Sequence, residues 1–247
     1  MSGYALGVQR FHPEQNSDTK ILRVTDDIDL TNPPSQGDVA GMSAGEIIWQ
    51  PTEDFLQNSN VSRLMRRIQI NDPKELIHRS ASDPEWFWET ILDDMKIEWY
   101  RKYDRLMDMS DGFPWTKWFV GGEINIAHNC LDRHAFGARK DQTALIWEGD
   151  DGNVRSYTYE KMAFEVSRLA NAIKNEGLVP GDSAGIYMPM APETVFAMFA
   201  CFKTGVAAIP IFSAFGSGAL AARLHDAGAR LLFTADYGLR RGKTVPI

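Results

Sequence analysis

Alternating strand-like and helix-like segments between residues 183 and 234 constrain the fold of this chain most strongly. Residues 183–188, 206–212 and 230–234 are short apolar runs of strand length, whereas residues 194–202 and 217–227 have helical spacing. Strand, helix, strand, helix, strand is typical of a parallel sheet whose crossovers are helices. The sequence therefore predicts an α/β fold with a parallel βαβαβ portion.

The ends of this portion indicate an incomplete sheet. The helix expected at residues 194–202 is apolar on nearly all sides, which favours burial between the sheet and further protein. Only 13 residues follow Thr234, too few for another helix and strand. We therefore expect a sheet edge that is open to a partner or to more chain.

The segment before the parallel portion predicts a hairpin followed by a helix. Residues 143–147 and 155–157 are strand-like and flank a turn-rich loop. Thr158 can then cap a helix over residues 159–176, and Gly177 can end it in a left-handed conformation.

The N-terminal third divides into a leader and a helical region. Residues 1–45 are rich in Ser, Gly, Asn and Asp without periodicity, so we expect a mobile or surface-bound leader. Residues 46–109 are helical in pattern, with an N-cap at Asp83 followed by proline. An apolar stripe is expected on that helix, formed by Trp88, Ile91, Leu92, Met95 and Trp99. Residues 110–247 make the α/β part.

Composition excludes several classes of protein. With 26 Lys and Arg against 33 Asp and Glu, the net charge of -7 has the wrong sign for a nucleic-acid binder. Residues 204–222 are uncharged, but Pro210 and several glycines favour a buried strand and helix over a membrane span. Cys130 and Cys201 lack paired spacing, and the N-terminus lacks a signal peptide, so we expect a cytoplasmic protein.

The segment GLRRGKT at residues 238–244 resembles a P-loop, but its spacing is wrong. Three residues rather than four separate the two glycines, and Val-Pro-Ile cannot open the helix that a P-loop needs. The basic cluster remains: Arg240, Arg241 and Lys243 beside Gly242 can hold a phosphate, or they form a solvated basic loop.

A histidine-rich segment offers a further candidate. His128, Cys130, Asp132 and His134 have side chains that bind metals or form nucleophile pairs, but no second group of suitable spacing accompanies them. We expect them to hydrogen-bond structurally. The sequence thus predicts neither a metal site nor a catalytic residue.

Three adjoining motifs carry a resemblance to a known family. WTKWF at residues 115–119, GGEIN at 121–125 and NCLDRH at 129–134 resemble the N-terminal signature of the acetyl-CoA synthetases, which are AMP-forming ligases of acetate or short-chain acyl groups. The resemblance extends from about Glu46, through Trp49, to the end of the chain, and residues 1–45 match nothing in the family. It implies a helical cap followed by the first part of an adenylation domain.

The resemblance also implies a reaction and its cofactors. ATP, with Mg²⁺, and a carboxylate give an acyl-adenylate, and coenzyme A then displaces AMP. The family's ATP loop and catalytic lysine have no counterpart here, so we expect no activity and no tight cofactor binding from this chain alone. By position, Arg240, Arg241, Gly242 and Lys243 correspond to the turn that binds the 3′-phosphate of coenzyme A. Ala214 stands beside coenzyme A, where the family usually has glycine.

A function from another class remains open. The chain can instead be a non-catalytic module that binds a partner protein through its open sheet edge, or a phosphate-bearing ligand through residues 240–243. For the ligase, the expected partners are small molecules, with neither nucleic acid nor a membrane.

Overall fold

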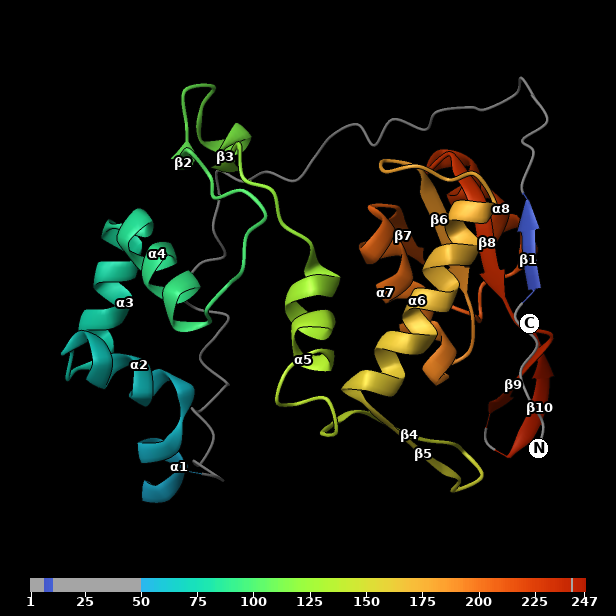
Figure 1. The fold of residues 1–247 in the computed structure, drawn as a ribbon, viewed down its shortest axis with the longest axis horizontal. Helices are drawn as coiled ribbons and strands as arrows, with labels where there is room; N and C mark the ends of the chain where they lie inside the picture. Colours follow the sequence, from blue (N-terminus) through green and yellow to red (C-terminus); the bar gives the residue numbers. More distant parts are fainter. Residues whose placement is uncertain (1–6, 11–49, 241) are drawn as a thin grey trace, which may run out of the picture. The chain divides into compact units, whose positions relative to one another are not determined.

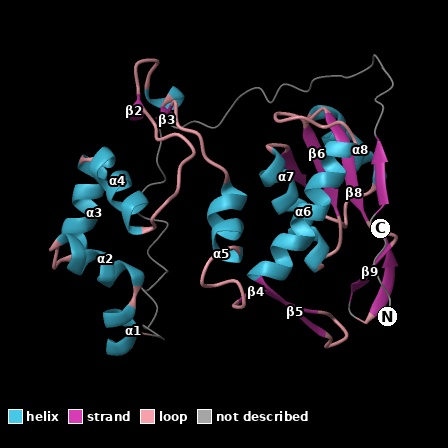
Figure 2. Cartoon of the chain, in the orientation of Figure 1, coloured by secondary structure: helices cyan, strands magenta, loops and turns pink. Residues whose placement is uncertain are grey.

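The computed structural model describes residues 7–10, 50–240 and 242–247. The predicted leader falls almost wholly outside these residues, as do Trp49 and Arg241. The chain divides into two compact units, one of residues 15–96 and one of residues 1–14 with 97–247. The first is helical throughout its described part, and the second mixes helices and strands (Figure 2).

Four helices with polar N-caps form the described part of the smaller unit. They are α1 (Glu53–Asn58), α2 (Asn60–Ile68), α3 (Pro73–Ser82) and α4 (Pro84–Asp94). Asp83 caps α4 as predicted, since its carboxylate accepts a hydrogen bond from the backbone N–H of Trp86 at 3.0 Å. A small core of Met65, Ile70 and Leu76 holds the helices together.

The predicted apolar stripe on α4 is too long. The helix ends at Asp94, because Lys96 adopts a left-handed φ of 50° that stops the helical turn. Trp88 and Met95 are exposed. Trp99 lies in the other unit, where its ring contacts Tyr103 and Phe119.

The larger unit begins with short elements. They are β2 (Arg105–Asp108) paired with β3 (Lys117–Val120), the helical turns η1 (Phe113–Trp115) and η2 (His128–Asp132), and α5 (Arg133–Ala135). The predicted hairpin follows as β4 (Thr143–Glu148) and β5 (Val154–Thr158). Thr158 then caps α6 (Tyr159–Asn175) through its hydroxyl oxygen, as expected.

The predicted parallel portion is confirmed element by element. It comprises β6 (Ser183–Tyr187), α7 (Pro192–Thr204), β7 (Ala207–Pro210), α8 (Ser217–Asp226) and β8 (Ala229–Thr234). Strand β6 lies between β7 and β8 and is parallel to both. The uncharged stretch at residues 204–222 is therefore a strand and a helix. In the part of the chain that is described, no helix has both the length and the apolar character that a bilayer span requires.

Helices cover both faces of this sheet. Alternate residues of β6 point to opposite faces, so each face packs against different helices. Ala184 and Ile186 pack in the main core with residues of α6 and α7. Tyr187 packs instead with Leu224 of α8 in a second cluster. Chain connections explain this arrangement: α7 leads from β6 to one neighbour and α8 leads back to the other, so right-handed crossovers place the helices on opposite faces.

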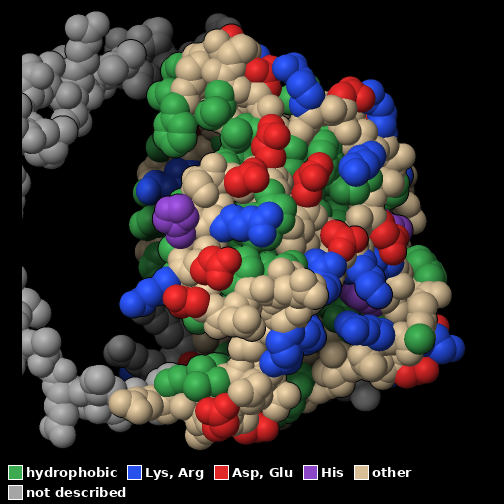
Figure 3. Space-filling view, turned by 90° about the vertical axis from the view of Figure 1, so that its left-hand side faces the viewer, with side chains coloured by type: hydrophobic (Ala, Val, Ile, Leu, Met, Phe, Trp, Pro, Cys, Tyr) green, Lys and Arg blue, Asp and Glu red, His purple; other side chains and the backbone are tan. Residues whose placement is uncertain are grey.

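Three strands complete the unit. β1 (Gly7–Arg10) pairs antiparallel with β8 and covers that edge of the sheet (Figure 1). After β8 the chain forms a hairpin of β9 (Tyr237–Arg240) and β10 (Lys243–Pro246). The sequence analysis predicts neither β1 nor this hairpin. On the face drawn in Figure 3, acidic and basic side chains are interspersed, in keeping with the modest negative charge.

Candidate functional site

A pocket of about 360 Å³ opens at the carboxyl ends of the three parallel strands. Pro189 and Met190 follow β6, Ser213 and Ala214 follow β7, and Gly238 lies in the hairpin after β8. The carboxyl edge of a doubly wound parallel sheet is where such folds bind ligands, because the connections diverge there. The pocket is therefore the candidate functional site.

Loops around the pocket are held by specific contacts. The Tyr187 hydroxyl at the end of β6 donates to the carbonyl oxygen of Phe215 at 2.6 Å, which fixes the loop that carries Ala214. Gly238 lies against Pro189, since a Cβ at residue 238 would come within 2.9 Å of the proline Cβ. These contacts join the loops after all three strands into one wall.

The hairpin of β4 and β5 forms the opposite wall. Its residues Trp147, Glu148, Gly149 and Asp150 line the pocket in succession. The turn beyond them is rigid: Asp151 accepts hydrogen bonds from the backbone N–H and the side-chain amide of Asn153, and the backbone N–H lowers the pKa of the Asp151 carboxyl. The walls are thus aromatic and apolar, with carboxylates at one margin.

Of the predicted site residues, Ala214 lines this pocket, and Arg241 lies outside the described residues. Residues of both strands that flank the basic turn also line it, among them Leu239 and Val245. Gly242, directly before β10, has a φ of 71°, in the left-handed region that favours glycine. Lys243 is exposed on β10 and is not part of the lining.

The β9–β10 hairpin also bears on whether residues 238–244 form a P-loop. Among the described residues 238–240 and 242–247 no helix begins; Lys243–Pro246 pairs with β9 as β10 instead. The backbone amides of this segment therefore do not converge at a helix N-terminus, which is the geometry that a P-loop needs.

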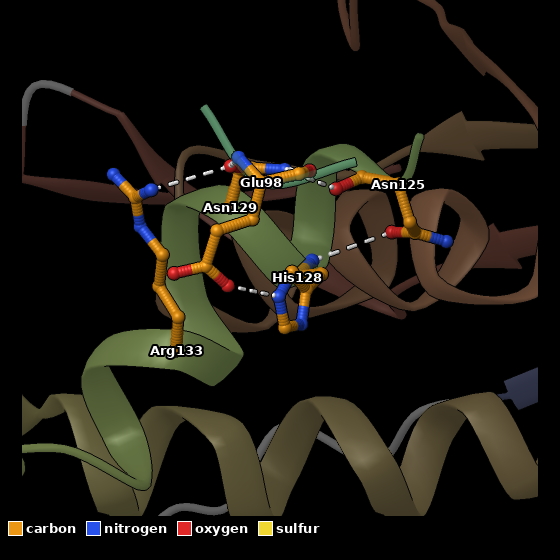
Figure 4. A network of polar contacts seen from close by, with 5 residues as sticks. All are labelled: Glu98, Asn125, His128, Asn129 and Arg133. Carbon is orange, nitrogen blue, oxygen red and sulfur yellow. Dashed lines mark hydrogen bonds and ion pairs between the residues drawn. The ribbon is translucent and has the colours of Figure 1, made fainter. Parts of the chain in front are cut away.

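The histidine-rich segment takes part in a network of hydrogen bonds. Asn129 is buried and makes a two-way contact with Glu98: its side-chain oxygen accepts from the Glu98 N–H at 2.9 Å, and its amide nitrogen donates to the Glu98 carbonyl at 2.8 Å. His128 lies 2.7 Å from the Glu98 carboxylate, and Arg133 contacts Asn129 (Figure 4). The network fixes the entry of η2.

The other members of that segment point to different neighbours. Asp132 pairs with Lys203, and the ring of His134 lies 5.0 Å from that of Tyr159. Burial, followed by the charges of Arg133 and Arg139, lowers the pKa of His134. Within residues 50–240 and 242–247 and the short β1 strand, no three His, Cys, Asp or Glu side chains gather as a metal site would need.

Cys201 lies where a thiol is poorly suited to act as a nucleophile. It is buried in the main core, and burial raises the pKa of its thiol to about 12. A thiol of that pKa carries almost no thiolate near neutral pH. Cys130 is exposed on η2, and neither cysteine is in a disulfide.

Sequence reasoning did not assign Trp147 or Met190 to the site. Trp147 belongs to a predicted strand, and Met190 lies in a loop after β6. Neither carries a motif for binding. Only the meeting of the β4–β5 hairpin with the sheet edge reveals them as walls of one pocket.

Comparison with protein families gives two adjoining matches. Residues 74–130 match the model of the acetyl-coenzyme A synthetase N-terminus, and residues 131–246 match that of AMP-binding enzymes. The second match contains the parallel sheet and every residue that lines the pocket except Ile247. The match to AMP-binding enzymes therefore covers the part of the chain that forms the sheet and the pocket.

Similar proteins point to one group of these enzymes. An acetyl-coenzyme A synthetase of Deinococcus radiodurans is 39% identical over 197 residues, covering 80% of this chain and 29% of the relative. That of Methanothrix soehngenii is 40% identical over 204 residues, covering 81% and 30%. The chain is similar to the acetyl-CoA synthetases and matches the N-terminal part of these relatives.

A solved structure supports the fold. The acetoacetyl-CoA synthetase from Streptomyces lividans superimposes with a TM-score of 0.73 at 23% sequence identity, covering 80% of this chain and 31% of that chain. The chain therefore spans less than a third of the length of these relatives.

Proposed function

We propose that this chain serves an AMP-forming ligase that joins acetate or another short carboxylic acid to coenzyme A. In the first step a carboxylate oxygen attacks the α-phosphorus of ATP, and pyrophosphate leaves. In the second the sulfur of coenzyme A attacks the acyl carbon of the adenylate, the thiol proton is lost, and AMP leaves. Such chemistry depends on positioning and charge stabilisation more than on a protein nucleophile.

Within that reaction we assign the pocket to coenzyme A. The carrying observation is that Ala214 and both strands flanking the basic turn line one pocket at the sheet edge. Aromatic and apolar walls suit a planar base. Arg240, Arg241 and Lys243 in the turn would supply positive charge to the 3′-phosphate, and Gly242 gives the turn its shape.

ATP and Mg²⁺ are not assigned to residues of this chain. The described residues provide no carboxylate group suited to a magnesium site, and the segment at residues 238–244 is a hairpin instead of a phosphate loop. We therefore expect the 247-residue chain by itself to leave acetate without adenylation and to bind coenzyme A weakly.

The segment boundaries follow the same assignment. Residues 46–109 would be the family's helical region, residues 110–247 the first part of the adenylation domain, and residues 1–45 a leader. Two unpaired cysteines suit a reducing cytoplasm, where acetate, ATP and coenzyme A would meet.

Separate assays of the two half-reactions test the coenzyme A assignment. In the protein expressed from its complete coding sequence, Arg240→Ala should raise KM for coenzyme A about tenfold, since a charge-assisted phosphate contact is lost. Acetate-dependent exchange of pyrophosphate into ATP should remain largely intact. Equal loss of both activities would contradict the assignment, and the absence of both from the wild-type protein would contradict the proposed reaction.

A further inference from the structure

We propose that Arg155 is a positioning residue that holds the β4–β5 wall against the mouth of the pocket, through Glu193 and Trp147. This inference rests on the proposed coenzyme A pocket. It concerns a residue that does not line the pocket.

Arg155 forms a two-pronged ion pair with the start of α7. Its Nη1 lies 2.8 Å from Oε1 of Glu193, and its Nη2 lies 3.2 Å from Oε2. The Glu193 side chain is only 17% exposed, and that of Arg155 is 33% exposed. Glu193 belongs to the first turn of α7, where the helix dipole favours a carboxylate. Two parallel hydrogen bonds fix the direction of the guanidinium as well as its position.

The same guanidinium fixes Trp147. The Arg155 Cζ atom lies 4.5 Å from the centroid of the indole ring, a cation–π contact. The indole Nε1 donates to the carbonyl oxygen of Met190 at 2.7 Å, which ties the hairpin to the loop after β6. Gly149 lies close to the ring, since a Cβ there would meet Trp147 at 2.6 Å. Three contacts thus set the orientation of a side chain that lines the pocket.

The hairpin needs this anchor because it is only two strands wide. A lone two-stranded ribbon is marginally stable in water. Its base is held by the Tyr157 ring, which packs edge-on against Phe196 of α7 at 5.0 Å. Towards the turn, where Trp147, Glu148, Gly149 and Asp150 form the wall, the Arg155 pair and the Trp147 indole provide the links to the rest of the fold.

Arg230 provides a matched control. It pairs with Asp182, whose side chain is 18% exposed, nearly the same as Glu193. That pair joins β8 to the loop before β6 and does not border the pocket. Arg230→Met therefore removes a comparable ion pair of the same unit without touching the wall.

The experiment compares Arg155→Met, Arg155→Lys, Glu193→Gln and Arg230→Met in the protein expressed from its complete coding sequence. Arg155→Met should raise KM for coenzyme A about threefold to tenfold, with little change in KM for ATP or acetate. Arg155→Lys keeps the charge but not the planar fork, so its effect should be intermediate. Glu193→Gln keeps the volume of the partner and covers the case in which Arg155→Met fails to fold. Arg230→Met should leave KM for coenzyme A unchanged.

Backbone amide hydrogen exchange provides a readout that does not depend on activity. Exchange of residues 147–154 should quicken in Arg155→Met and Glu193→Gln but not in Arg230→Met. Unchanged exchange of this segment, or an equal rise in KM for coenzyme A in Arg230→Met, would overturn the positioning role. A wild-type protein that does not use coenzyme A would refute the proposed function, while the exchange comparison would still decide whether Arg155 holds the hairpin.

Discussion

The ammonium group of Lys203 lies 2.7 and 2.8 Å from the two carboxylate oxygens of Asp132, although 71 residues separate them in the sequence. Both side chains are mostly buried, at 27% and 15% exposure. Asn125 reinforces the link, because its amide nitrogen donates to the carbonyl oxygen of Phe202 at 3.0 Å. The signature segment is thereby attached to the carboxyl end of α7.

Removal of this ion pair should destabilise the larger unit. Asp132→Asn leaves the Lys203 ammonium without its charged partner in a poorly hydrated site, and we expect a loss of about 1–3 kcal/mol in the free energy of unfolding. Urea denaturation measures it. Asp111→Asn is the control, since Asp111 and its partner Lys117 are more than half exposed, and its cost should be below about 1 kcal/mol. Equal losses in the two variants would contradict the structural role of Asp132.

Substitution of Gly185 should also destabilise the sheet. A Cβ at this position of β6 would lie 2.4 Å from Cδ2 of Leu224, so Gly185→Ala must push α8 outward or displace Leu224. Overpacking of this kind costs about 1–3 kcal/mol. Gly218→Ala, in α8 where a Cβ meets nothing within 4 Å, should have the opposite sign because alanine favours helix. Thermal unfolding of both variants would test this. A Gly185→Ala protein as stable as the wild type would show that Leu224 moves aside at little cost.

The two cysteines should differ in reactivity. Cys130 is exposed, whereas Cys201 is buried and burial raises the pKa of its thiol to about 12. A disulfide reagent at pH 8 should therefore modify one thiol in the native protein and two after denaturation. Cys130→Ser should abolish the native reaction. Modification of Cys201 at the same rate as Cys130 would mean that the core opens readily.

Stability should fall on mild acidification through His134. Its pKa is lowered in the folded state by burial and by neighbouring arginines, so protonation favours unfolding. The stabilisation is complete above the unfolded-state pKa of about 6.5 and is lost as the pH falls below it. The difference in unfolding free energy between pH 7.5 and pH 5.5 should shrink in His134→Gln. An undiminished difference in that variant would assign the acid sensitivity to other groups.

The elements that the sequence predicts well are those whose periodicity arises from burial. From α6 to β8 each predicted element matches the observed one within a few residues, because sheet and helix faces both lie in one core. The predicted stripe on α4 was wrong because the helix ends before Lys96, whose φ is in the left-handed region. The β9–β10 hairpin was missed because all four residues of β10 are exposed, so no buried periodicity marks it.

The candidate site was predictable only in part. Ala214 and the basic turn were assigned through resemblance, and the structure brings Ala214 and the strands flanking that turn to one pocket. Trp147 and Met190 were not assigned, because the hydrogen bond between them spans 43 residues and leaves no local pattern. The walls of the pocket come from segments that are far apart in the sequence. Local sequence patterns do not show which distant segments pack together.

Strand β1 has a consequence for how the protein is made. It places Gly7 opposite Thr234, so β1 must wait for a partner that is synthesised much later in the chain. The loop that closes is long, but closure entropy grows only with the logarithm of its length. β1 can therefore still pair across this distance. We expect the parallel core of β6, β7 and β8 to assemble first, because its contacts are closer in sequence, and β1 to add in a later step.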